Sequence, residues 1–367
     1  MSHMTYAEAM VVGLIQGVTE LFPVSSLGHN VLIPALIGGS WAQDLNVSAS
    51  ESPYLAFIVG LHVATALALI AYFWRDWLRI ISGFVSSVVE RRVATPDQRL
   101  AWMIILATIP VGIAGLLLEH LFRVVFSKPI PTAIFLALNG LILLGGERLR
   151  RARLAARSSL AAAEADGVPA VGAPALGLAT SAAGAMGSVA IPLGAAVPGS
   201  GHAPTTAAAG QGLAGRHASG QRAVRHGETA AAVEADARLS IMSFVQAVLI
   251  GSAQIFALLP GISRDGIVTV SGMLRGMSRE DAVRYSFLLS APVILAAGVL
   301  KIPADLLGSL GNGIHGQILV GSVLSFVGAY LSVRFLVRYF RQSRSLTPFA
   351  IYCLVAGLGS LAYLVLR

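Results

Sequence analysis

Charged residues and cysteine are both scarce in this sequence. Only 12% of the 367 residues are charged and 55% are hydrophobic, with a mean hydropathy of +0.75, whereas a typical soluble domain has about 25% charged residues. This composition excludes an ordinary soluble domain and indicates a membrane protein. The one cysteine, Cys353, lies in an apolar stretch, which excludes a disulfide framework and leaves the redox compartment open.

Lysine is also rare, although the chain is strongly basic. The net charge is +8 and the pI is near 10.1, yet only 2 of the 26 basic residues are lysines. Most of the arginines flank apolar runs, where such residues set the orientation of a membrane protein. We therefore expect membrane lipid, and no nucleic acid, as the partner of this basic chain.

Six stretches are long and apolar enough to cross a bilayer, which takes about 20 residues. They are residues 56–74, 101–119, 130–146, 285–301, 316–337 and 348–366.

Two further apolar regions, 8–37 and 241–275, are interrupted by P-V-S-S-L-G-H and P-G-I-S-R-D-G. Irregular backbone survives at membrane depth only where protein or a water-filled cavity satisfies its polar groups. We interpret each region as a re-entrant helical hairpin, which enters and leaves the membrane on one side.

Loop charge predicts the orientation of the spans. Arginines follow the first span, from Arg75 to Arg99, and precede the last one, from Arg338 to Arg344, so these loops should be cytoplasmic. Loops 38–55 and 302–315 contain no Lys or Arg and should lie outside.

The two halves then have the same parts in opposite orientation. Each comprises one hairpin and three spans, which is an inverted-topology repeat. L-F-P-V-S-S from Leu21 and L-L-P-G-I-S from Leu258 align with one offset, which pairs Ser26 with Ser263. We expect an all-α polytopic membrane protein with repeats at 1–149 and 238–367, joined by a low-complexity, flexible cytoplasmic linker at 150–237.

Polar residues gather at the first break. Gln16 and Glu20 share one helix face, and an ionisable group at membrane depth is a functional candidate by default. A hydroxyl of Ser25 or Ser26 near the His29 imidazole would supply an activated nucleophile. The alternatives are that Glu20 pins the break and that one or both serines cap the following helix.

The second break has the composition of an anion cradle. Gly261 permits close backbone approach, Ser263 offers a hydroxyl and an amide, and Arg264 presents a planar fork suited to phosphate oxygens. The alternative is a structural ion pair of Arg264 with Asp265 or Glu20. We leave His62 outside the predicted site, because a histidine in a span more often bonds a backbone carbonyl.

These motifs resemble those of the BacA/UppP family of undecaprenyl-pyrophosphate phosphatases. Q-G-V-T-E, P-V-S-S-L-G-H and P-G-I-S-R-D-G-I-V-T match its acidic, serine-histidine and phosphate-binding motifs. Two positions depart from the pattern: Asp265 stands where the family has serine, and Val268 stands where it has threonine.

The resemblance implies a bacterial inner-membrane enzyme that removes the terminal phosphate of undecaprenyl pyrophosphate. That reaction recycles the lipid carrier of peptidoglycan synthesis and underlies bacitracin resistance, with the active site on the outer side and Mg or Ca as cofactor.

By position, the resemblance implies roles for six residues. Ser26, His29 and Glu20 would be catalytic, with Glu20 also a metal ligand, and Arg264, Ser263 and Gln16 would bind the pyrophosphate. From the residues themselves we add Ser25, with its hydroxyl, and Gly261, which permits close backbone approach, to the predicted pyrophosphate-binding set. Ser26 is the first choice of nucleophile and water is the alternative.

A polyprenyl-phosphate transporter or flippase is the competing hypothesis, because such proteins are also built from inverted repeats with a site at the midplane. A structural scaffold is less compatible with ionisable groups in apolar surroundings. A homodimer is left open.

Overall fold

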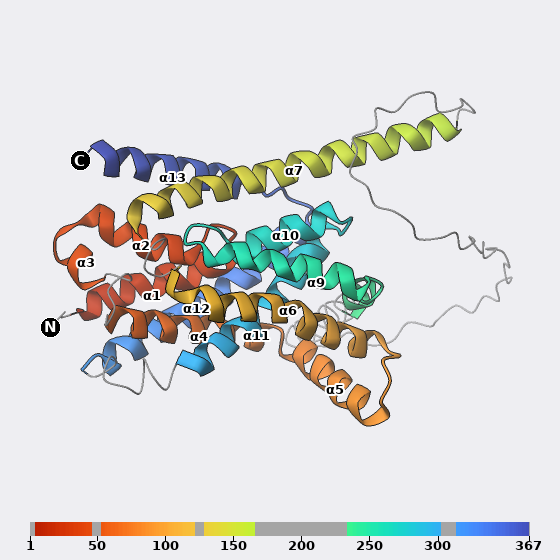
Figure 1. Cartoon of the computed structure of the whole chain (residues 1–367), viewed down its shortest axis with the longest axis horizontal. Coiled ribbons are helices and arrows are strands. Elements are labelled where there is room, and N and C mark those ends of the chain that lie inside the picture. The colour runs from red at the N-terminus through yellow and green to blue at the C-terminus, as the bar shows by residue number, and fades with distance from the viewer. Residues whose placement is uncertain (1–3, 46–52, 122–127, 166–232, 302–312, 367) are drawn as a thin grey trace, which may run out of the picture. The chain divides into compact units, whose positions relative to one another are not determined.

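The computed structural model is helical, with no strand among the residues that it describes (Figure 1). Those residues are 4–45, 53–121, 128–165, 233–301 and 313–366. The first half contains α1 (Tyr6–Leu21), α2 (Ser26–Ile37), α3 (Gly39–Asp44), α4 (Pro53–Tyr72), α5 (Trp74–Glu90), α6 (Pro96–Leu121) and α7 (Pro129–Ala165). The second half contains the helical segment Val233–Ser240, α9 (Phe244–Ser252), the 3-10 helix η2 (Ala253–Leu258), α10 (Arg264–Leu274), α11 (Arg279–Lys301), α12 (His315–Arg341) and α13 (Thr347–Leu366).

Six of these helices, α4, α6, α7, α11, α12 and α13, are long and apolar enough to cross a membrane. The prediction of six spans is confirmed, and the protein is a multi-pass membrane protein. The helices extend beyond several of the predicted spans, most of all α7. Hydropathy locates the apolar part of a helix, whereas backbone hydrogen bonding continues into its polar flanks.

The predicted linker, 150–237, differs from the structure at both ends. α7 continues to Ala165, because the sequence from Glu147 onward is rich in the strong helix formers Ala, Arg, Leu and Glu. The segment Val233–Ser240 is helical as well. The remaining linker residues, 166–232, lie outside the described part of the chain. Contacts divide the chain into two units, one of Met1–Leu154 with Ala231–Arg367 and one of Ala155–Ala230.

Both predicted breaks are present as interruptions between helices. One separates α1 from α2 over residues 22–25, and the other separates η2 from α10 over residues 259–263. The arginine-rich segment after α4, which we expected as a loop, is mostly the amphipathic helix α5.

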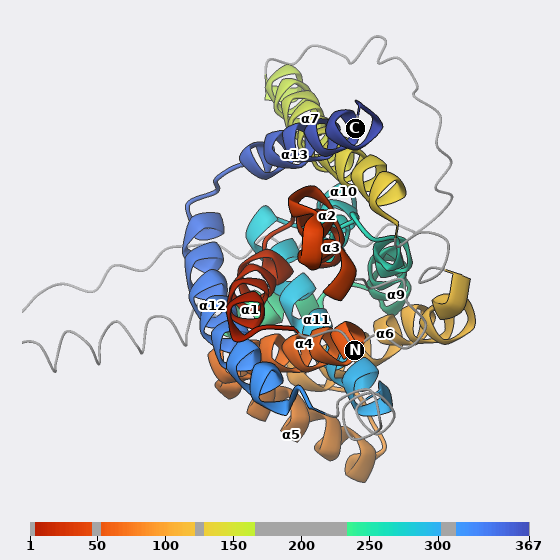
Figure 2. The same ribbon diagram turned by 90° about the vertical axis from the view of Figure 1, so that its left-hand side faces the viewer.

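Small residues allow α1 to pack closely on α12, and α1 also contacts α4 (Figure 2). A Cβ added to Gly17 would lie 2.3 Å from the Ser325 carbonyl oxygen, and one added to Gly13 would lie 2.4 Å from that of Gly321. Close backbone approach through small residues is a common means of helix association in membranes. This contact fixes the helix that carries Gln16 and Glu20.

We predict that Gly17→Ala destabilises the protein by about 1–3 kcal/mol, because the added methyl group must push two backbones apart. Gly145→Ala in α7 is the matched control, since a Cβ there meets nothing within 4 Å. Thermal unfolding in detergent should show a lower Tm for Gly17→Ala only. Equal Tm values for the two variants would contradict the close α1–α12 contact.

Candidate active site

The first break places two serines at the start of α2. Phe22 is extended (φ −66°, ψ 141°), as expected of a residue before proline, and this ends α1 at Leu21. Ser25 is the N-cap of α2, and its Oγ accepts from the Gly28 amide at 3.3 Å. Because Ser25 has φ 68°, which is unusual for serine, surrounding contacts must hold its conformation.

The second break is built in the same way. Leu259 is extended before Pro260 (φ −75°, ψ 119°), and Gly261 has φ 113°. Ser263 is the N-cap of α10, with its Oγ accepting from the Gly266 amide at 3.1 Å. The two capping serines are thus Ser25 and Ser263, one residue away from the pairing of Ser26 with Ser263 that the sequence alignment indicated.

The two breaks contact each other directly. The Gly261 amide donates to Ser25 Oγ at 3.1 Å, and a Cβ added to Gly28 would lie 3.1 Å from the Gly261 Cα. A Cβ on Gly261 would also lie 2.6 Å from the Thr132 carbonyl oxygen of α7. Gly261 therefore has both a positive φ and no room for a side chain. Its amide is already hydrogen-bonded to Ser25 within the protein.

Asn139 of α7 joins both breaks, and sequence analysis did not identify it. Its Nδ2 donates to the Pro23 carbonyl and its Oδ1 accepts from the Ser263 amide, each at 3.0 Å. The side chain is fully buried. Its presence as a polar side chain within the predicted span 130–146 is the one feature of the sequence that could have identified it.

Glu20 is the centre of the polar cluster between the breaks. Its Oε2 accepts from Gln16 Nε2 at 2.8 Å and from the Ser26 hydroxyl, and its Oε1 lies 2.6 Å from Arg264 Nη2. The Glu20 side chain is only 4% exposed. Four of the residues predicted from sequence therefore lie in one hydrogen-bonded group that spans both halves of the chain.

Two further side chains complete this group. His62 Nδ1 donates to the Ile58 carbonyl at 2.8 Å, the backbone role we expected, but its Nε2 lies 3.4 Å from Glu20 Oε2. Asn30 Nδ2 donates to Gln16 Oε1 at 2.6 Å, which orients the Gln16 amide toward Glu20. Both were polar residues in apolar surroundings, and that was their only signal in the sequence.

His29 bonds the backbone of the first break and a residue of α13. Its Nδ1 donates to the Ser25 carbonyl at 2.7 Å, so in the neutral ring Nε2 accepts from the Tyr352 hydroxyl at 2.7 Å. The two rings are stacked, with centroids 5.7 Å apart. In this structure the hydrogen-bond acceptor of Ser26 is thus Glu20, in place of the imidazole suggested by sequence proximity.

Asp265 points away from the cluster toward α11. Its Oδ1 accepts from Ser286 Oγ at 2.5 Å and from Ser290 Oγ at 2.6 Å. Of the two ion pairs that the sequence left open for Arg264, the structure has the one with Glu20.

The donor set does not fit a divalent metal held by protein ligands alone. Mg and Ca take six or more oxygen ligands, but both oxygens of Glu20 already accept hydrogen bonds, one of them from the Arg264 cation. Among the described residues, no group of three His, Cys, Asp or Glu side chains could hold a metal ion.

This arrangement is suited to phosphoryl transfer. Glu20 can accept the Ser26 proton as the hydroxyl attacks, and the Arg264 guanidinium matches phosphate oxygens. The first amides of α10 have no carbonyl partner within the helix, and such amides favour an anion.

Comparison with known families agrees with this geometry. The family described as bacitracin resistance protein BacA matches residues 9–193 and 216–359, a range that includes both breaks. The chain belongs to the BacA family.

Individual relatives match all or nearly all of the chain. A protein of Mycolicibacterium paratuberculosis named undecaprenyl-diphosphatase is 54% identical, over 100% of this chain and 99% of its own length. A protein of Mycobacterium avium with the same name is 53% identical over the same shares. One from Granulibacter bethesdensis, also named undecaprenyl-diphosphatase, is 35% identical over 98% of this chain and 97% of its own length.

We predict that Asn139→Leu lowers both stability and activity. The apolar side chain would leave the Ser263 amide and the Pro23 carbonyl buried without their partner, at about 1–3 kcal/mol for each group. Leu138→Ala is the control, because Leu138 is on the same helix but exposed. The Tm in detergent and the rate of phosphate release should fall for Asn139→Leu and change little for the control; an unchanged Asn139→Leu protein would show that the bridge is dispensable.

Proposed function

We propose that this BacA-family protein acts as an undecaprenyl-diphosphatase through the cluster around Glu20. It hydrolyses undecaprenyl pyrophosphate to undecaprenyl phosphate and inorganic phosphate, which recycles the lipid carrier for peptidoglycan synthesis. The observation that supports this site is that one buried carboxylate, that of Glu20, accepts hydrogen bonds from both the Ser26 hydroxyl and the Arg264 guanidinium.

In the first step, Ser26 Oγ attacks the terminal phosphorus. Its O–H bond breaks and the proton passes to Glu20 Oε2, while the bond from phosphorus to the bridging oxygen breaks and undecaprenyl phosphate leaves. Water then hydrolyses the phosphoserine and releases phosphate. Direct attack by water, with Glu20 as the base, is the alternative path to the same products.

Arg264 has a second role in this scheme. Without substrate it neutralises Glu20, which would otherwise be a buried unpaired charge. A diphosphate offers the guanidinium more negative charge than one carboxylate does, so Arg264 can turn toward the substrate. That change releases Glu20 Oε1 from its ion pair at the step in which Glu20 Oε2 accepts the serine proton.

We predict that Ser26→Ala and Arg264→Ala each lower phosphate release from undecaprenyl pyrophosphate by about 10³-fold or more, because one removes the nucleophile and the other the charge that stabilises the transferred phosphoryl group. Arg275→Ala, at the exposed C-terminal end of α10, is the control and should retain activity. The test uses purified protein in detergent, with folding checked by Tm.

The outcomes separate the candidate functions. Trapping of a phosphorylated Ser26 would distinguish serine attack from water attack. A folded wild-type protein that is inert on polyprenyl pyrophosphates, yet moves a phosphorylated lipid between leaflets, would overturn the enzyme in favour of a flippase.

The divalent metal, Mg or Ca, stays a prediction. Both carboxylate oxygens of Glu20 already accept hydrogen bonds and so are not free to bind a metal. We therefore propose that any metal would enter bound to the diphosphate oxygens, which such ions bind readily. We expect chelation by EDTA to abolish phosphate release without lowering the Tm of the substrate-free protein. A loss of Tm on chelation would instead indicate a resident metal site.

We also propose that the two breaks are the turns of re-entrant hairpins in an inverted-topology repeat. Each break has proline after an extended residue and a serine N-cap, and the two are in contact. The same interpretation places one repeat in residues 1–149 and the other in 238–367, with α7 and the segment Val233–Ser240 extending past these limits.

The location proposed is the bacterial inner membrane, with the active site facing the outer side. The arginines flanking α5 and those near the end of α12 support a cytoplasmic position for that side of the protein. A homodimer stays a prediction.

A further inference from the structure

Helix α5 has an apolar face that the rest of the described chain does not cover. Hydrophobic residues recur along it at intervals of four, three, four and three residues, which places them on one helix face. Each is at least 51% exposed, and the charged residues between them in the sequence, Arg75, Asp76 and Arg79, fall outside this face. This apolar stripe consists of Trp74, Leu78, Ile81, Val85, Val88 and the adjacent Val89.

The opposite face of α5 attaches the helix to the protein. Ile80 packs in a buried cluster with residues of α6 and α11, and a Cβ added to Gly83 would lie 2.8 Å from the Asp97 carbonyl carbon. The stripe is thus on the far side from the core, so core packing does not explain its composition.

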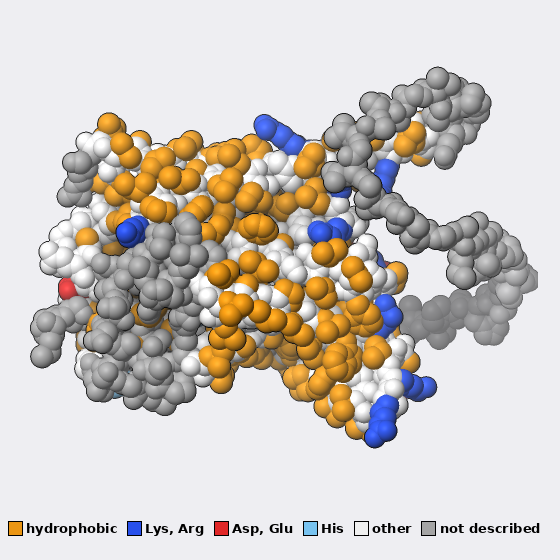
Figure 3. Space-filling view, viewed as in Figure 1, with side chains coloured by type: hydrophobic (Ala, Val, Ile, Leu, Met, Phe, Trp, Pro, Cys, Tyr) orange, Lys and Arg blue, Asp and Glu red, His pale blue; other side chains and the backbone are white. Residues whose placement is uncertain are grey.

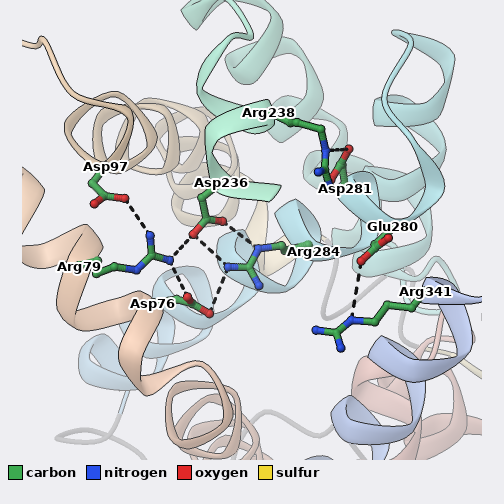
Figure 4. A network of polar contacts seen from close by, with 9 residues as sticks. All are labelled: Asp76, Arg79, Asp97, Asp236, Arg238, Glu280, Asp281, Arg284 and Arg341. Atoms are coloured by element: carbon green, nitrogen blue, oxygen red, sulfur yellow. Dashed lines mark hydrogen bonds and ion pairs between the residues drawn. The ribbon is translucent and has the colours of Figure 1, made fainter. Parts of the chain in front are cut away.

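Ion pairs fix the orientation of this attached face (Figure 4). Arg79 Nη2 lies 2.7 Å from Asp76 and 2.6 Å from Asp236, and Arg284 of α11 lies 2.8 Å from Asp236 and 3.1 Å from Asp76. The Asp236 side chain is only 1% exposed. Helix α5 therefore cannot rotate to bury the stripe without exposing or unpairing these charges.

The position of α5 in the chain points to lipid as the partner of the stripe. α4, a candidate span, ends at Tyr72, and α5 begins two residues later at Trp74. Figure 3 shows hydrophobic side chains over α5 and its neighbour α6, with basic side chains at the outer end. The stripe therefore continues the apolar surface of the spans at a membrane boundary, where aromatic residues concentrate.

The charges at the end of α5 favour an anionic surface. Arg91 and Arg92 follow the helix and are exposed, and the adjacent Glu90 pairs with Arg92 at 3.0 Å. A strongly amphipathic helix with apolar residues on one face and arginines beside it is the type that lies in the headgroup layer of anionic lipids.

We propose that α5 lies in the headgroup layer of an anionic leaflet, with its apolar stripe in the lipid and Arg91 and Arg92 on the headgroups. The contact is independent of the catalytic scheme, since none of the residues in the cluster around Glu20 belongs to α5. It would hold the α5 end of the ion-pair network, and with it α11 and the segment Val233–Ser240, at a fixed depth.

The test attaches a polarity-sensitive fluorophore to single added cysteines. Cys353 is fully buried, so the unsubstituted chain measures background labelling. Ile81→Cys and Val85→Cys report on the stripe, and Glu90→Cys reports on an exposed position outside it. Each labelled protein is reconstituted in phosphatidylcholine vesicles with or without phosphatidylglycerol.

We expect the two stripe positions to show a blue shift, strong quenching by a nitroxide placed shallow in the acyl chains, and a several-fold lower iodide quenching constant than Glu90→Cys. Phosphatidylglycerol should strengthen nitroxide quenching, and Arg91→Gln with Arg92→Gln should remove that increase.

Equal iodide quenching at all three positions would overturn the proposal. So would protection from iodide without nitroxide quenching but with disulfide crosslinking at Val85→Cys, which would mean that a second copy covers the stripe. A wild-type response unaffected by phosphatidylglycerol would overturn the anionic lipid.

Discussion

The pairing of Glu20 with Arg264 is the interaction on which the rest of this structure depends. Glu20 at the end of α1 and Arg264 at the start of α10 lie beside the two breaks, and each charge is costly to bury alone. Together they are stable only if the two breaks touch. The glycine contact between Gly28 and Gly261 and the Ser25 hydrogen bond provide that proximity. In the proposed scheme, a diphosphate substrate competes with Glu20 for this arginine.

The surrounding elements hold this pair in place without reacting. α1 is set by its backbone contact with α12, and Asn139 of α7 satisfies one backbone group from each break. Such groups cannot turn to water at membrane depth, so each needs a partner from another helix. The irregular backbone that makes the site possible is therefore stabilised by side chains distant in the sequence.

At the arginine-rich boundary, the chain uses charge differently. Asp76, Arg79, Asp236 and Arg284 form a network that connects α5, α11 and the segment Val233–Ser240. There the ion pairs join helices, whereas at the centre a single pair lies next to a hydroxyl that can react. Asp236 is as buried as Glu20, so the neighbouring nucleophile, and not burial, distinguishes the candidate catalytic charge from the structural one.

The sequence by itself determined the membrane class, the six spans, the two breaks and most residues around Glu20, because hydropathy, proline and rare polar groups are local signals. It also determined that Gln16 and Glu20 meet, since they are one helical turn apart. Only the tertiary structure decided that Ser26 bonds Glu20 while His29 bonds Tyr352, and that Arg264 pairs with Glu20 and not with Asp265. It also decided that Asn139 joins the two breaks and that His62 and Asn30 complete the cluster around Glu20. Each of these choices depends on which side chain a packed neighbour brings within hydrogen-bond distance, and no local pattern encodes that distance.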